Sequence, residues 1–219
     1  MKGRIIVVLM IMILIFSSCL ILISIPVSAV EEYKFSSNIR INDDTLTVMQ
    51  TSPGIAVANN GYVYIVWGDG RNDPINLDIY CSKSTDGGNI FGDGIENTDI
   101  RVDSNSGSSS QRNPTITTYN NEVYVVWMDD RTSVYHIYFA KSTDHGATFG
   151  TNVRVDSSPS DAICEYPDIK VTSTGTICVV WHEYLSSKGN YDVYYSESID
   201  GGDSFSARVR VDDTDTGSS

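Results

Sequence analysis

The strongest constraint on the fold of this chain is a short pattern that occurs three times, Ser-x-Asp-x-Gly-x-x-Phe. Each position suits a tight turn between two antiparallel strands, because Ser and Asp oxygens accept hydrogen bonds from unpaired amides and glycine permits a positive φ. We expect the Phe to fold back into the core and fix the turn. The positions that carry the pattern are Ser84, Asp86, Gly88, Phe91, Ser142, Asp144, Gly146, Phe149, Ser198, Asp200, Gly202 and Phe205.

Much of the sequence between these turns is repeated as well, which indicates a repeated structural unit rather than a recurring turn. In each unit a proline precedes a short apolar strand, and the next strand is the most apolar one. This second strand ends in Trp67, Trp127 or Trp181, and its lack of polar alternation predicts burial on both faces. A third strand leads into the turn, and a fourth has the alternation of an outer edge strand.

The spacing of the tryptophans fits a four-stranded blade of a β-propeller. Trp67 and Trp127 are 60 residues apart, and Trp127 and Trp181 are 54 apart. No helical periodicity follows the N-terminal apolar segment. We therefore predict an all-β fold for residues 30–219, a β-propeller segment of three four-stranded antiparallel blades. The expected blades cover about residues 50–102, 111–155 and 164–211.

The turn pattern resembles the Asp-box, or BNR repeat, of the sialidase-like six-bladed β-propellers. Three regularly spaced copies make this resemblance specific, and it extends over Asn38–Ser219. It implies that the Asp-boxes are structural turns on the side of the propeller away from the active site. Three blades do not close a six-bladed ring. Either further C-terminal blades complete it, or two copies of the chain join as a homodimer.

The N-terminus has the organisation of a signal peptide. The apolar run Ile5–Ile25 follows Lys2 and Arg4 and precedes the small-residue site Val27-Ser28-Ala29. We predict that residues 1–29 direct export and are cleaved, which gives a secreted or cell-surface protein. A retained membrane anchor is the alternative, because about 20 apolar residues suffice to span a bilayer. Contact with a membrane is expected only through this segment.

The chain is strongly acidic, with a formal net charge of -13. Without residues 1–29, which contain Lys2 and Arg4 but no acidic residue, the charge is -15. Such a surface repels phosphate backbones, and the sequence has no basic cluster. Nucleic acid is therefore excluded as an expected partner.

Cys81, Cys164 and Cys178 remain after the N-terminal segment, and their pairing is not decidable from sequence. Cys81 and Cys178 occupy aromatic positions of the other repeats, so we expect buried apolar side chains. No spacing typical of a zinc site accompanies them. The acidic segments Asn42–Asp44 and Asp212–Asp215 offer oxygen ligands for Ca²⁺ but lack the full loop spacing. We expect no metal or other cofactor.

Candidate functional residues follow from the resemblance. In sialidases three arginines hold the substrate carboxylate, a Tyr activated by a Glu attacks the anomeric carbon, and an Asp acts as acid and base. An arginine fork matches a carboxylate, and tyrosine needs a neighbouring base to become a nucleophile. On the face opposite the Asp-boxes, the resemblance implies as candidates Arg71, Arg112, Arg131, Glu165, Tyr166, Glu183 and Tyr184.

A structural interpretation competes with this one. Trp-x-Asp-x-Arg occurs at the same place in two repeats, ending in Arg71 and Arg131, and a feature repeated in each blade favours a structural ion pair. The Arg-Ile-Pro motif of the family is missing, since Asn42 follows Ile41. Glu183 departs from the repeat, which indicates either a function at this position or drift in a solvent loop. We therefore expect a glycan-binding or scaffolding module, with an incomplete glycoside hydrolase of the exo-α-sialidase type as the alternative.

Overall fold

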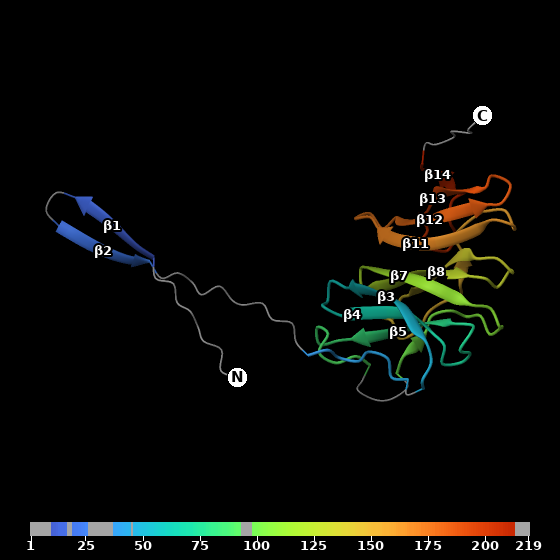
Figure 1. Ribbon diagram of the computed structural model, residues 1–219, viewed down its shortest axis with the longest axis horizontal. Coiled ribbons are helices and arrows are strands. Elements are labelled where there is room, and N and C mark those ends of the chain that lie inside the picture. The colour runs from blue at the N-terminus through green and yellow to red at the C-terminus, as the bar shows by residue number, and fades with distance from the viewer. Residues whose placement is uncertain (1–9, 17–18, 26–36, 45, 93–97, 213–219) are drawn as a thin grey trace. The chain divides into compact units, whose positions relative to one another are not determined.

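The computed structural model describes residues 10–16, 19–25, 37–44, 46–92 and 98–212. These residues form an all-β structure with two compact units, Met1–Asn38 and Ile39–Ser219 (Figure 1). The first unit contains the antiparallel strands β1 (Met10–Phe16) and β2 (Cys19–Ile25). Within the described ranges no helix is long and apolar enough to cross a membrane. The predicted site Val27-Ser28-Ala29 lies outside these ranges.

The described part of the second unit contains three four-stranded antiparallel sheets. In each sheet the strands follow one another in chain order, from β3 to β6, from β7 to β10 and from β11 to β14. This is the meander of a propeller blade, so the predicted all-β, blade-like fold is confirmed. The strands are β3 (Gln50–Val57), β4 (Val63–Asp69), β5 (Asp78–Ser84), β6 (Ile100–Arg101), β7 (Gln111–Tyr119), β8 (Glu122–Asp129), β9 (His136–Ser142), β10 (Val153–Arg154), β11 (Ile163–Val171), β12 (Ile177–Leu185), β13 (Asn190–Ser198) and β14 (Val209–Arg210).

Two hydrophobic cores lie between neighbouring sheets. Because side chains of a strand alternate between its faces, Val125 and Trp127 of β8 enter the core shared with the first sheet. Tyr124 and Val126 of β8 enter the core shared with the third sheet. The predicted burial of the second strand on both faces is therefore confirmed for β8. The first strands β3, β7 and β11 are neighbours in space as well.

The same prediction is wrong for β12, whose burial alternates along the strand. Val179 and Trp181 are buried against the second sheet, whereas Val180 is 38% exposed. No sheet covers the opposite face of β12 within the described residues. Cys178 lies on that face and is only half-buried, while Cys81 is buried as expected. Burial raises the pKa of the Cys81 thiol to about 12.

The prolines do not begin the first strands, as the sequence had suggested, but lie inside them at a β-bulge. Pairing with the second strand shifts between Thr51 and Gly54, and the other two sheets show the same shift. The residue before each proline has a positive φ, at Ser52, Asn113 and Tyr166. The three first strands thus share a position with a left-handed backbone conformation, occupied by serine, asparagine or tyrosine. Bulky residues rarely adopt this conformation.

The repeated turns connect the third and fourth strands and are closed by their own side chains. In the second sheet, Ser142 Oγ donates to Asp144 Oδ1 at 2.7 Å and accepts from the Gly146 amide at 2.8 Å. Asp144 Oδ1 also accepts from the amides of Ala147 and Thr148. The other two turns have the same Ser–Asp and Gly–Ser hydrogen bonds. These contacts explain why Ser, Asp and Gly recur.

The aromatic residue of each turn is less deeply buried than expected. Phe149 is half-buried at the edge of the core between the first and second sheets. Phe205 is also half-buried and lies edge-on to Phe139 of the preceding sheet, with ring centroids 5.3 Å apart. The turn is therefore held mainly by its hydrogen bonds and by contact with the neighbouring sheet.

The glycine of the turn makes this contact with the preceding sheet. A Cβ atom added to Gly202 would overlap the Phe139 ring, and one added to Gly146 would lie 2.9 Å from Tyr64. A Cβ atom added to Gly88 would meet only Val63, at 3.9 Å. All three glycines have a positive φ. Close packing therefore requires glycine at positions 146 and 202, and the backbone conformation favours glycine in all three turns.

Gly202→Ala should lower the free energy of unfolding by about 2–4 kcal/mol, because it adds overpacking to the strain of a positive φ. Gly88→Ala is the matched control, and it should lose only the backbone part, about 1 kcal/mol. Urea unfolding followed by tryptophan fluorescence measures both values. Equal losses in the two variants would contradict the packing contact with Phe139.

Asp144→Ala should lower the melting temperature by about 2–4 °C at pH 7, because the loss of the turn's hydrogen bonds costs about 1 kcal/mol. Hydrogen bonds from Thr148 and Ser142 lower the pKa of Asp144. This stabilisation is complete above the unfolded pKa near 4 and declines as the pH falls from there through the lower folded pKa. The difference between the melting temperatures of the two proteins should therefore become smaller from pH 7 to pH 3. An unchanged difference at pH 3 would contradict the role of the carboxylate.

Candidate functional site

The Trp-x-Asp-x-Arg segments form a closed set of contacts at the end of the second strand. Asp69 Oδ2 accepts from Trp67 Nε1 and from a guanidinium nitrogen of Arg71, both at 2.8 Å. Asp69 Oδ1 accepts from the Arg71 amide at 2.8 Å. The Arg71 guanidinium lies 4.1 Å from the centroid of the Tyr80 ring. One carboxylate therefore fixes the indole, the turn and the guanidinium together.

The second sheet repeats this arrangement. Asp129 accepts from Trp127 Nε1 at 3.1 Å and from two guanidinium nitrogens of Arg131 at 2.9 and 2.6 Å. Arg131 lies 4.1 Å from the centroid of the Tyr138 ring and also donates to Asn152. This geometry agrees with the structural interpretation of the motif. It also means that the Arg131 fork already binds a carboxylate of its own chain.

Arg71 has more ion-pair partners than Arg131. It forms ion pairs with Asp43 at 2.9 Å and with Asp99 and Asp69 at 2.8 Å each, and its side chain is only 13% exposed. Burial and the nearby Asp43 carboxylate raise the pKa of Asp99 to about 6. A buried guanidinium with three carboxylate partners is not available to bind a substrate carboxylate.

The third sheet keeps the carboxylate–guanidinium contact with different residues, but Trp181 Nε1 has no hydrogen-bond partner among the described residues. Glu183 stands where the other sheets have aspartate, and Leu185 stands where they have arginine. Arg208 supplies the missing guanidinium, with Nε 3.0 Å from Glu183 Oε2 and the cation 4.8 Å from the centroid of the Tyr194 ring. Glu183 is 2% exposed, so the expectation of a solvent loop at this position was wrong. Its carboxylate is part of the sheet's interior.

Sequence reasoning missed Arg208, although the repeat alignment contains the signal. Asp99, Asn152 and Arg208 occupy one position of the three units, two residues before the arginine of the fourth strand. In the first two units this residue accepts a hydrogen bond from the arginine of the motif. In the third unit this position is an arginine, Arg208, while Leu185 occupies the position of the motif arginine. The second change removes a guanidinium and the first one supplies it.

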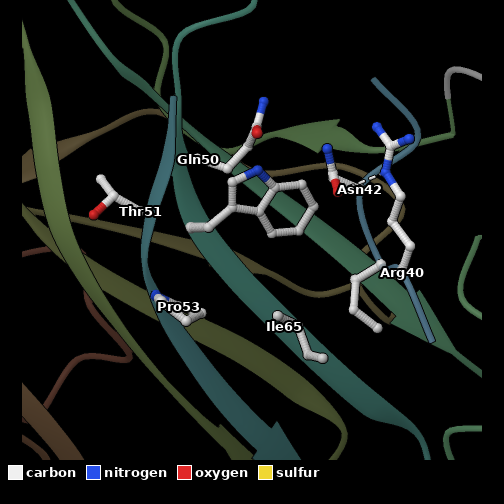
Figure 2. Close-up of a pocket in the computed structure, with 8 residues that line it drawn as sticks. Arg40, Asn42, Gln50, Thr51, Pro53 and Ile65 are labelled. Atoms are coloured by element: carbon white, nitrogen blue, oxygen red, sulfur yellow. Dashed lines mark hydrogen bonds between the residues drawn. The ribbon is translucent and has the colours of Figure 1, made fainter. Parts of the chain in front are cut away.

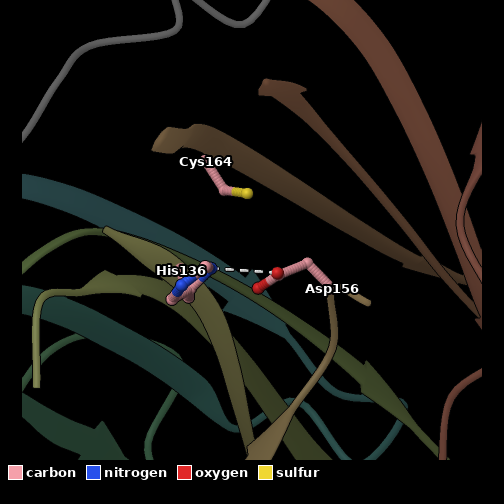
Figure 3. A group of neighbouring side chains, drawn as sticks. All are labelled: His136, Asp156 and Cys164. Atoms are coloured by element: carbon pink, nitrogen blue, oxygen red, sulfur yellow. Dashed lines mark hydrogen bonds and ion pairs between the residues drawn. The ribbon is translucent and has the colours of Figure 1, made fainter. Parts of the chain in front are cut away.

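A buried polar group between the second and third sheets has the composition of a metal site. One ligand atom each of His136, Asp156 and Cys164 lies within 4.8 Å of the others (Figure 3). His136 Nδ1 is 3.0 Å from Asp156 Oδ1. However, a guanidinium nitrogen of Arg154 lies 2.9 Å from His136 Nδ1 and 2.8 Å from the same carboxylate oxygen. Although burial raises it, hydrogen bonds from His136 and Arg154 hold the pKa of Asp156 at about 2.

The equivalent positions in the other sheets explain this group. Asp78 and Asp192 stand where the second sheet has His136, and they form ion pairs with Arg101 and Arg210 of their own fourth strands. His136 therefore occupies one position of a repeated ion-pair network. Because the arginine already lies against the histidine nitrogen and the carboxylate, a cation would meet a positive charge there. We interpret the group as structural.

A cavity of about 220 Å³ lies on the outer face of the first sheet (Figure 2). Ile65 and Trp67 line it from the sheet, and Ile41 lines it from the segment that precedes the first strand. Val102 directly follows the fourth strand of the first sheet and packs in the core with Trp127, and Val155 directly follows that of the second sheet and packs in the core with Trp181. Ile41 resembles these valines, because it lies beside Trp67, the tryptophan of the sheet that comes after it. The cavity is the part of this face that Ile41 leaves uncovered.

Four aromatic rings of the third sheet form a surface that we call the aromatic face: the exposed Tyr166, His182 and Tyr191 and the half-buried Tyr184. Ring centroids are 6.1 Å apart for Tyr166 and His182, 6.4 Å for His182 and Tyr191, and 5.1 Å for Tyr184 and Tyr191. Tyr166 is 61% and Tyr191 57% exposed. Strand pairing explains the arrangement, because Tyr184 lies opposite Tyr191 on the neighbouring strand.

The aromatic face lies at the end of the sheet opposite the repeated turns. In the pairing of β12 with β13, Ser198 of the turn is opposite Ile177, and Tyr191 is near the other end of the strand. The bulge of β11 presents Tyr166 there with a φ of +52°. The same bulge and positive φ occur at Ser52 and Asn113, so they belong to the repeated strand, and the third sheet differs in placing an aromatic ring there.

The sequence-derived candidates therefore separate into two sets. Arg71, Arg131 and Glu183 take part in the repeated internal ion pairs. Glu165, Tyr166 and Tyr184 belong to the aromatic face or adjoin it, since Glu165 is paired with His182. Arg112 is exposed at the position of the second sheet that corresponds to Glu165 and donates to Ser110 Oγ. Among the described residues, no contact joins these three arginines, and they do not surround one accessible point.

Arg208→Ala should destabilise the third sheet by about 2 kcal/mol or more, because it leaves the buried Glu183 carboxylate without its cation. Leu185→Arg in the same protein should restore a large part of this loss, since it recreates the spacing of the other two sheets. Leu185→Arg alone is the control. Urea unfolding of the three variants gives the coupling free energy. No recovery in the double variant would contradict the exchange of positions.

No protein-family model matches the chain, and no curated protein matches it in sequence. Solved structures do match its fold. An α-L-arabinofuranosidase from Fusarium graminearum matches with a TM-score of 0.63 and 14% identity, over 80% of this chain and 53% of that one. An α-L-arabinanase from Penicillium chrysogenum matches with a TM-score of 0.58, 13% identity and the same coverage. A Hadza microbial sialidase matches with a TM-score of 0.56 and 13% identity, over 71% of this chain and 36% of that one.

These similarities extend over much of this chain but only part of each solved structure. The chain spans about a third to a half of the length of the proteins it matches. At such low identity the likeness concerns the fold and not the site residues. Together with the three antiparallel sheets, it shows that the chain has the sialidase-like β-propeller fold of these glycoside hydrolases.

Proposed function

We propose that this chain is an exported glycan-binding module and that the aromatic face is its binding surface. The observation that carries the proposal is the group of three exposed rings, Tyr166, His182 and Tyr191, and the half-buried Tyr184 at the end of the sheet opposite the repeated turns. Its wider context is a fold shared with proteins whose names describe action on arabinose-containing or sialic acid-containing glycans. Export rests on the N-terminal sequence alone.

The chemistry of the aromatic face suits a sugar. Tyrosine and histidine combine an apolar ring, which packs against the C–H surface of a pyranose or furanose, with a polar atom that hydrogen-bonds hydroxyl groups. Glu165 lies beside the rings and interacts with the Tyr191 hydroxyl, so it adds an acceptor. The short separations of the rings allow one glycan to contact several of them.

The repeated turns take a structural role in this proposal. We assign them to the Asp-box repeats of the sialidase-like propellers, on the basis of the pattern and of the hydrogen bonds of Ser142, Asp144 and Gly146. They lie at the end of the sheets away from the aromatic face. Damage to a turn should therefore affect stability without changing affinity per folded molecule.

A glycoside hydrolase is the second candidate, because Tyr191 and Glu165 form a tyrosine–carboxylate pair. In this pair the hydrogen bond to Glu165 raises the pKa of Tyr191, which makes the phenol harder to ionise. A nucleophilic tyrosine needs the opposite effect in the reacting state. Arg71 and Arg131, two of the three arginines proposed for a carboxylate clamp, bind carboxylates of the chain itself. The binding module is therefore preferred.

Titration calorimetry against a panel of soluble oligosaccharides tests the binding function. Tyr166→Ala should weaken binding about tenfold, which corresponds to loss of one contact of about 1.4 kcal/mol. Tyr62→Ala is the matched control, because Tyr62 forms a similar edge-on pair with His145 but near the repeated turns. An equal loss with Tyr62→Ala, or no glycan bound at all, would contradict the proposal.

Hydrolysis assays separate the second candidate from the first. Fluorogenic sialosides and arabinofuranosides report turnover by the purified protein. We expect none. Turnover that Glu165→Gln and Tyr191→Phe both abolish, in proteins that remain folded by circular dichroism, would instead establish a hydrolase that uses this pair.

A further inference from the structure

We propose that the glycan recognised at the aromatic face carries a free amino group, and that Glu165 binds this group as an ammonium ion. This inference rests on the proposed glycan-binding function and names the chemical class of its ligand. It contrasts with the carboxylate sugar that a clamp of arginines would select. Three independent features of the third sheet support it: the position of Glu165, the pairing of nearby cations, and the comparison between repeats.

Glu165 is the acid of the aromatic face. It lies opposite His182 in the pairing of β11 with β12, and its interaction with the Tyr191 hydroxyl raises the pKa of Tyr191. His182 in turn has Tyr166 on one side and Tyr191 on the other, at centroid distances of 6.1 and 6.4 Å. A carboxylate beside aromatic rings is well suited to an ammonium ion, which gains a charge-assisted hydrogen bond and cation–π attraction.

The cations around this face already pair with carboxylates of the same sheet. Lys170 pairs with Asp168 at 3.1 Å, and Lys188 pairs with Asp192 at 3.5 Å. Arg208 is directed to Glu183 in the interior. Within the described residues, Glu165 has no such ion-pair partner at salt-bridge distance. The surface thus offers a negative charge to a ligand and no uncommitted cation to an acidic sugar.

The repeats show that this charge is particular to the third sheet. Thr51, Arg112 and Glu165 occupy the same position before the bulge in the three first strands. Arg112 donates to Ser110 Oγ and to the Ile75 carbonyl, which belongs to the first sheet. A negative charge at the bulge therefore coincides with the sheet that also carries the exposed rings. The formal net charge of -13 also favours a cationic ligand over an anionic one.

Two oligosaccharides of equal length that differ in the acetylation, and hence the charge, of their amino groups test the inference. A glucosamine tetramer carries free amino groups, and the N-acetylglucosamine tetramer of equal length is neutral. Calorimetry at pH 6, where the amines are protonated, should show about tenfold tighter binding of the glucosamine tetramer. Raising the salt concentration from 50 to 500 mM should weaken that binding and leave any binding of the neutral tetramer nearly unchanged.

Glu165→Gln should remove the tenfold preference while retaining the rings. Glu197→Gln is the matched control, because Glu197 also accepts from a tyrosine hydroxyl, that of Tyr195 at 2.7 Å, on the same strand as Tyr191 but at the end near the repeated turn. The control should keep the preference. A preference that survives Glu165→Gln would overturn the assignment of the ammonium site.

The outcomes distinguish this inference from the proposed function. If the neutral tetramer or a sialylated oligosaccharide binds as tightly as the glucosamine tetramer, and Tyr166→Ala weakens that binding, the module binds glycans but the amino-sugar assignment is wrong. If none of these oligosaccharides binds, both proposals fail. Tighter binding of the glucosamine tetramer, lost in Glu165→Gln and kept in Glu197→Gln, supports both.

Discussion

The contact between neighbouring sheets is the interaction on which this structure depends. A four-stranded sheet of this size has two apolar faces, and each becomes stable only when another sheet covers it. The second sheet achieves this on both sides, with Trp127 facing the first sheet and Tyr124 the third. Even the turns serve the contact, since Gly146 and Gly202 approach aromatic rings of the preceding sheet. The unit is therefore a stack in which each sheet determines the environment of the next.

Polar networks at the ends of the strands also recur from sheet to sheet. A buried carboxylate that binds an indole and a guanidinium pairs these polar groups where the chain leaves the core. Asp69 and Asp129 have this role. In the third sheet Glu183 pairs with the guanidinium of Arg208, an arginine from a different place in the sequence, whereas Trp181 Nε1 has no hydrogen-bond partner among the described residues. The arrangement is preserved while the residues change, which indicates that the geometry of the network, and not the motif, is required by the fold.

The sequence was sufficient to predict the blades, because their turns and buried strands depend on local chemistry. Ser142, Asp144 and Gly146 form contacts within five residues of each other, and such contacts are visible in a repeat. Tyr166 was predicted only as a residue of the face opposite the Asp-boxes, since the bulge that presents it depends on pairing with β12. The aromatic face escaped prediction for a related reason. Tyr166, His182 and Tyr191 come from three strands, and only the pairing of those strands brings the rings together.

The two outer faces of the stack differ in a way that bears on binding. The outer face of the first sheet is apolar, with Ile55 and Val57 exposed near Trp67, and it resembles the faces that are buried between sheets. The outer face of the third sheet carries Glu165 and Glu197 among its aromatic residues. Covering it with another apolar sheet would remove these charges from water at a cost of several kcal/mol each. A hydrated, partly charged ligand such as a glycan meets no such cost, because it leaves both carboxylates hydrogen-bonded. The charges on this face therefore suit a hydrated, partly charged ligand.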